Sequence, residues 1–84
     1  MENTDCRLEE EIQKWTARLL PELEKAEATD SSGQELLDNA EAYVKDSKTF
    51  KEQGDLVRAF EALVWAWAHL EIGQRLELIE KEEK

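Results

Sequence analysis

Cysteines and helix-breaking residues are scarce in this sequence, whose 84 residues include one cysteine, one proline and three glycines. Cys6 stands alone, so an internal disulfide is excluded. No apolar run approaches the roughly 20 residues that span a bilayer, and no signal peptide precedes the first amphipathic pattern. Strand-like alternation between turn residues is not found either. These absences favour a helical protein of the reducing cytoplasm.

An excess of positive charge is also missing. The chain has 21 acidic and 11 basic residues, which gives a formal net charge of -10. No cluster of lysines and arginines is dense enough to build a phosphate-binding stripe, so we expect no nucleic-acid partner. The same repulsion disfavours binding to an anionic membrane surface.

Apolar residues recur at intervals of three and four in three segments, which predicts helices at about residues 5–28, 33–53 and 55–80. Pro21 lies inside the first segment and is expected to kink that helix, because proline cannot donate a hydrogen bond to the carbonyl of Ala17. Short connections make neighbouring helices antiparallel. We therefore predict an all-α, antiparallel three-helix bundle that forms a single domain over residues 1–84.

Turn residues mark both connections. Gly54 can end the second helix in the left-handed conformation, and the Asp55 carboxylate can then cap the third helix. Residues 29–33 form a polar linker, in which Ser31 or Ser32 has the spacing of a capping box for the second helix.

The third helix should supply the centre of the core. Its main apolar stripe contains Phe60, Leu63 and Trp67. Gly73 lowers helix stability by about 1 kcal/mol relative to alanine, so the helix is expected to bend or fray there. The residues expected to pack against the main stripe come from the other two helices: Leu36, Ala40 and Tyr43, with Ile12, Trp15 and Leu19.

A second apolar side of the third helix carries Trp65, Ile72 and Leu76. These positions fall within about 40° of one another on a helical wheel, away from the main stripe. Because exposed apolar patches usually mark association, we predict a working surface here, either a homodimer contact or a docking site for a partner. The alternative is that the first helix, kinked at Pro21, wraps far enough to cover them.

Part of the chain carries a family pattern. Tyr43 is followed by Asp46 and Phe50, then by the turn Gly54–Asp55, and later by Ala59, Ala66 and Leu70. Over residues 40–73 this pattern resembles the archaeal family catalogued as domain of unknown function 357. Trp65, Ala68 and Glu71 stand where that family has tyrosine, glycine and aspartate. The resemblance implies a compact antiparallel helical bundle, an archaeal cytoplasmic source and no established activity.

Patterns for catalysis or metal binding are weak. His69 is the single histidine, and the residue three positions before it is Ala66 rather than the glutamate of a di-iron bundle. Cys6 has no partner ligands for a zinc site. The serines have neither a nucleophile elbow nor a base, and no glycine-rich phosphate loop is present. We therefore predict no enzymatic activity, no cofactor and no metal.

Two classes of function follow. The leading prediction is a non-enzymatic protein–protein interaction module, acting as a homo-oligomer or as a small subunit of a larger assembly. The alternative is a binder of a small ligand or a divalent cation. It would use Asp46 and Glu71, the acidic positions that the family resemblance singles out, provided that they face each other across two helices.

Overall fold

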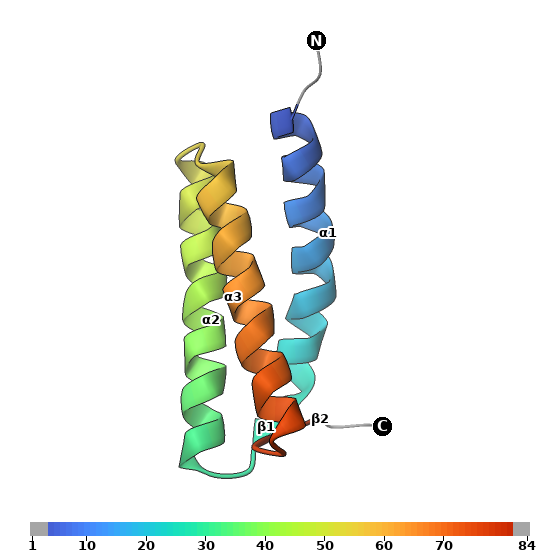
Figure 1. The fold of residues 1–84 in the computed structure, drawn as a ribbon, viewed down its shortest axis with the longest axis vertical. Helices are drawn as coiled ribbons and strands as arrows, with labels where there is room; N and C mark the ends of the chain where they lie inside the picture. The colour runs from blue at the N-terminus through green and yellow to red at the C-terminus, as the bar shows by residue number, and fades with distance from the viewer. Residues whose placement is uncertain (1–3, 82–84) are drawn as a thin grey trace.

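The computed structural model describes residues 4–81 and contains three long helices that run alternately up and down (Figure 1). They are α1 (Thr4–Lys25), α2 (Ser31–Glu52) and α3 (Leu56–Arg75). Two strands of three residues each, β1 (Ala26–Ala28) and β2 (Ile79–Lys81), lie at one end of the bundle. The predicted all-α, antiparallel three-helix bundle is confirmed. Helix α1 continues through Pro21 without interruption.

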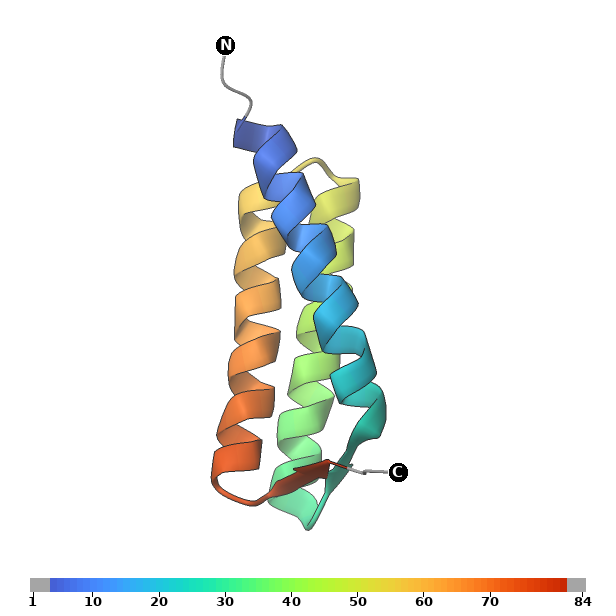
Figure 2. The same ribbon diagram turned by 90° about the vertical axis from the view of Figure 1, so that its right-hand side faces the viewer.

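The three helices are not packed equally. Helices α2 and α3 share most of the contacts between helices, whereas α1 lies mainly against α3 and has little contact with α2. Small side chains explain the close α2–α3 pair, because Ala40, Ala59, Ala62 and Ala66 are all buried and let the two backbones approach. The pair forms one unit, and α1 is laid across it (Figure 2).

The expectation that the chain has no strand is wrong at the end of the bundle that holds the α1–α2 connection. Strands β1 and β2 pair antiparallel, with Ala26 opposite Lys81 and Ala28 opposite Ile79 (Figure 2). The first helix therefore ends at Lys25 rather than near Ala28. The backbone N–H of Thr29 extends the pairing by donating to the carbonyl of Leu78 at 2.9 Å. Segments this short carry no alternating pattern that a sequence could reveal.

Helix α3 ends earlier than predicted because the chain reverses at Glu77. This residue has a φ of 63°, in the left-handed region. The N–H of Leu78 donates to the carbonyl of Gly73 at 2.8 Å, and the N–H of Glu77 donates to the carbonyl of Gln74 at 3.2 Å. These two bonds are those of a Schellman motif, which turns the chain back towards the core.

Two glycines make room for the returning chain. A Cβ on Gly73 would lie 2.3 Å from the Cδ1 of Ile79, and a Cβ on Gly33 would lie 2.0 Å from the carbonyl oxygen of Leu78. The helix does not fray at Gly73, which is buried and helical. The expectation of a bend there missed the packing role of this glycine, which lets Ile79 close the end of the core.

The predicted α2–α3 turn is confirmed in detail. Gly54 has a φ of 82°, and the N–H of Asp55 donates to the carbonyl of Phe50 at 2.8 Å, the long bond of a second Schellman motif. The Asp55 carboxylate then accepts a bond of 3.1 Å from the N–H of Arg58, as a helix cap should.

The cap of α2 differs from the prediction. Asp30, rather than Ser31 or Ser32, is the capping residue, and its carboxylate accepts a bond of 3.0 Å from the N–H of Gly33. Asp30 has extended backbone geometry, which suits an N-cap, and Ser31 is already helical. An aspartate and a serine cap helices about equally well, so spacing alone did not distinguish them.

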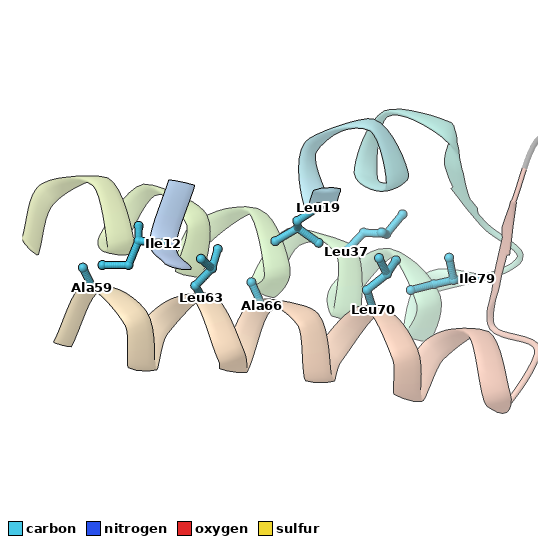
Figure 3. Packing of buried hydrophobic residues seen from close by; sticks show 8 residues of the cluster. All are labelled: Ile12, Leu19, Leu37, Ala59, Leu63, Ala66, Leu70 and Ile79. Carbon is cyan, nitrogen blue, oxygen red and sulfur yellow. The ribbon is translucent and has the colours of Figure 1, made fainter. Parts of the chain in front are cut away.

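The core is centred on a different stripe of α3 from the one predicted. Leu63 and Ala40 are fully buried as expected. The residues that α3 contributes to the buried core cluster, however, are Ala59, Leu63, Ala66 and Leu70 (Figure 3). At 100° per residue this stripe is rotated by roughly 60° from the predicted one. The rotation follows from the alanines, which place α3 closer to α2 than to α1.

The aromatic side chains fill the wider seam between α1 and α3. Trp15 meets Phe60 edge to face, with ring centroids 5.4 Å apart, and meets Trp67 in the same manner at 6.4 Å. All three rings are only partly buried. Phe60 and Trp67 therefore flank the core rather than centre it, which corrects the prediction. Leu36 and Tyr43 are likewise partly buried.

Candidate interaction site

The outward side of α3 is apolar. Of the six large apolar side chains that are exposed in the described part of the chain, four lie on this helix and a fifth, Leu76, is its C-cap. We call these five residues the outer face of α3: Val57, Val64, Trp65, Ile72 and Leu76.

The three predicted interface residues belong to this face. Trp65 is 54% exposed, Ile72 is 49% exposed and Leu76 is 63% exposed, so helix α1 does not cover them. Helical periodicity places them on one side of α3, while Leu63 and Leu70 face the core. The alternative, in which α1 wraps over Trp65, is not what the structure shows.

Trp65 is held in place by two neighbours. Its ring stacks beside that of Tyr43 on α2, at 6.4 Å between centroids and 25° between planes. His69, one turn further along α3, lies 5.2 Å from the Tyr43 ring. The Nδ1 of His69 is 2.8 Å from the carbonyl oxygen of Trp65, so Nδ1 carries the proton in this bond. The three rings form a cluster that fixes the Trp65 side chain at the surface.

This cluster is not predicted from the sequence, because the apolar stripe of α2 places Tyr43 in the core. The spacing of Trp65 and His69, four residues apart on one helix, was a signal that the two side chains are neighbours. Their meeting with Tyr43 could not be read from the sequence, since it depends on the rotation of α3 against α2.

The two candidate carboxylates do not converge. Asp46 is exposed on α2, and Glu71 lines a shallow hollow between α1 and α3 together with Trp15 and Arg18. Ser47, next to Asp46, is level with Ala59 through a hydrogen bond. Glu71 lies twelve residues beyond Ala59, or roughly 18 Å along the helix axis. The hypothesis of a shared Asp46–Glu71 cation site therefore has no geometric support.

Residues 4–81 contain no group of three or more His, Cys, Asp or Glu side chains placed to hold a metal ion. Cys6 is exposed and is not part of a disulfide. Within residues 4–81 no helix is long and apolar enough to cross a membrane.

Comparison with known proteins identifies the family. Residues 7–79 match the model of a family described as protein of unknown function, DUF357. A crystal structure of a DUF357 protein from Archaeoglobus fulgidus is similar, with a TM-score of 0.84 and 40% sequence identity, over 94% of this chain and 99% of that one. The comparison with curated proteins found no match. The chain therefore belongs to the DUF357 family, whose three-helix architecture it shares.

Proposed function

We propose that this protein is a small, non-enzymatic interaction module of the cytoplasm, which joins a larger assembly by docking a protein partner on the outer face of α3. One observation carries the proposal: among the described residues, five of the six exposed large apolar side chains lie on α3 or at its C-cap. Scattered apolar residues are normal on a protein surface, but large exposed apolar side chains gathered on one side of a helix usually mark association.

The composition of the face supports a docking role. Trp65 lies within it, and tryptophan is enriched among the residues that dominate binding energy. Because Tyr43 and His69 already hold its ring, little side-chain freedom is lost when a partner covers it. Exposed charged residues of α3 lie among and beside these apolar side chains and can supply the polar contacts that interfaces also have: Arg58, Glu61, Glu71 and Arg75.

The net charge restricts the kind of partner. With a formal net charge of -10, the chain attracts a positively charged protein over long range and repels an acidic one. We therefore propose a partner that presents an apolar groove or helix face within a basic surface. Steering of this kind raises the association rate and weakens as salt is added.

A comparison of matched baits tests the proposal. Wild-type protein and a Trp65→Glu variant are immobilised and exposed to native cell extract, with Ala42→Glu as the control. Ala42 is exposed on α2, so this control adds the same charge away from the outer face of α3. Circular dichroism verifies that all three chains are folded.

The proposal expects one protein to be retained by wild type and Ala42→Glu and lost by Trp65→Glu. The purified partner should then bind wild type in calorimetry at least tenfold more tightly than it binds Trp65→Glu. Equal retention by all three baits, or equal affinity in calorimetry, would reject the outer face of α3 as the docking site.

A further inference from the structure

A second surface lies on another side of the bundle, where α1 and α2 have little contact. They leave an apolar groove of about 490 Å³ between them. Leu20 from α1 and Val44 from α2 line it, and the charged side chains on its wall are Lys48 and Lys51. Leu20 is 48% exposed and is the one large exposed apolar residue of the described chain that does not belong to the outer face of α3.

The groove continues past Leu20 and Val44 with the opposite charge. These two residues also line a smaller hollow of about 240 Å³, whose charged residues are Glu24 and Glu41. Since α1 and α2 are antiparallel, Glu24 and Glu41 lie on the same side of Leu20, towards the strands. The groove is thus basic at one end, apolar in the middle and acidic at the other end.

Two-fold symmetry makes such a surface complementary to itself. If a second copy lies along the groove with the symmetry axis near Leu20, its acidic end meets Lys48 and Lys51, and its basic end meets Glu24 and Glu41. The two Leu20 side chains then cover each other at the axis. A small anion or an amphipathic ligand of one charge would match only half of this pattern.

We infer that the α1–α2 groove is a self-association surface, on which a second copy of this chain docks antiparallel and centred on Leu20. Apolar burial around Leu20 and Val44 supplies affinity, while the paired charged ends fix the orientation and exclude the parallel arrangement. The surface is separate from the outer face of α3, so a dimer formed in this way presents two copies of that face to partners. The inference stands whether or not the outer face of α3 docks a partner.

Charge exchange tests the inference by sedimentation velocity. One double variant, Lys48→Glu with Lys51→Glu, makes both ends of the groove acidic. The other, Glu24→Lys with Glu41→Lys, makes both ends basic. We expect wild type to sediment as a dimer that dissociates on dilution, each double variant alone to sediment as a monomer, and an equimolar mixture of the two to form a heterodimer. Only cross-pairing between the variants restores opposite charges at both ends.

Matched controls change the same charges elsewhere. Lys14→Glu with Lys25→Glu gives the same net charge as the first double variant, and Glu10→Lys with Glu35→Lys gives the same net charge as the second. These residues are exposed and do not line the groove, so both controls should dimerise as wild type does.

Three results would overturn the inference: a wild type that is monomeric at every concentration, double variants that dimerise like wild type, or a mixture that stays monomeric. Circular dichroism must show that each variant is folded. Trp65→Glu serves to separate the two surfaces, because the inference expects this variant to dimerise normally whatever it does to partner binding.

Discussion

The hydroxyl of Ser47 on α2 donates a hydrogen bond of 2.7 Å to the backbone carbonyl of Ala59 on α3. Both residues are buried, and Ser47 is the one polar side chain among the described residues that is buried. The bond joins the two helices close to the Gly54 turn, where their small side chains let the backbones approach. It fixes the register between α2 and α3 at one point, from which the Tyr43–Trp65 contact follows further along.

Replacing Ser47 with alanine should lower the free energy of unfolding by about 1 kcal/mol, the usual net value of one buried hydrogen bond. The carbonyl of Ala59 keeps its helical partner, so no acceptor is left without a bond. Urea denaturation followed by circular dichroism measures the change. Ser32→Ala, at an exposed position of the same helix, is the control and should stay within about 0.5 kcal/mol of wild type.

Truncation of Leu63 to alanine should be among the most damaging changes in the core. Leu63 is 0% exposed, and its loss should cost about 2 to 5 kcal/mol, a large share of the stability of so small a domain. The neighbouring Val64→Ala, on the exposed side, should cost far less. If Leu63→Ala melted within a few degrees of wild type, the assigned core stripe would be wrong.

The sequence predicts structure best where a residue acts on its nearest neighbours in the chain, as at the α2–α3 turn. Gly54 must adopt positive φ and Asp55 must cap a helix whatever surrounds them, so the α2–α3 turn was predictable. The face of α3 that turns inward was not, because α3 has apolar residues on most of its circumference. The rotation of α3 about its axis is set by its alanines, which pack closely against α2. Phe60 and Trp67 therefore lie beside the core rather than at its centre.

Gly33→Ala should disrupt the strand pair at the end of the bundle. The added Cβ would lie 2.0 Å from the carbonyl oxygen of Leu78, which belongs to the backbone and cannot rotate away as a flexible side chain could. Displacement of β2 would expose Ile79, which is now 3% exposed. We expect a loss of about 1 to 3 kcal/mol in unfolding free energy. Faster hydrogen exchange at the Thr29 amide, with unchanged exchange at the amides of the Gly54 turn, would locate the damage at the strand pair. If neither the unfolding free energy nor the exchange rates changed, the packing role assigned to Gly33 would be wrong.

Glu77→Gly should raise the stability. Glu77 holds the left-handed position of its Schellman motif at φ 63°, a place where glycine avoids the Cβ clash and gains about 1 kcal/mol. Its side chain is exposed, so little packing is lost. Thermal melting should show a higher midpoint for Glu77→Gly, while the same change at the neighbouring exposed Leu76 should lower it. A lower midpoint for Glu77→Gly would contradict the assigned turn.

The site was partly predictable. Trp65, Ile72 and Leu76 were placed on one surface by helical periodicity alone, and they are exposed together. The cluster of Tyr43 and His69 around Trp65, and the opposite charges along the α1–α2 groove, depend on contacts between helices. The separation of Asp46 from Glu71 also depends on contacts between helices. The periodicity of one helix does not tell how far along a neighbouring helix a given residue lies.

The most direct measurement of the central claim is site-specific photo-crosslinking in cells that produce the protein. A photoreactive amino acid replaces Ile72 on the outer face of α3, which leaves Trp65 in place, or replaces Ala42 on the exposed side of α2 as the control. The account predicts a discrete adduct with one other protein from position 72, its loss when Trp65→Glu is added, and no such adduct from position 42. No adduct from position 72, or the same adduct from both positions, would contradict it.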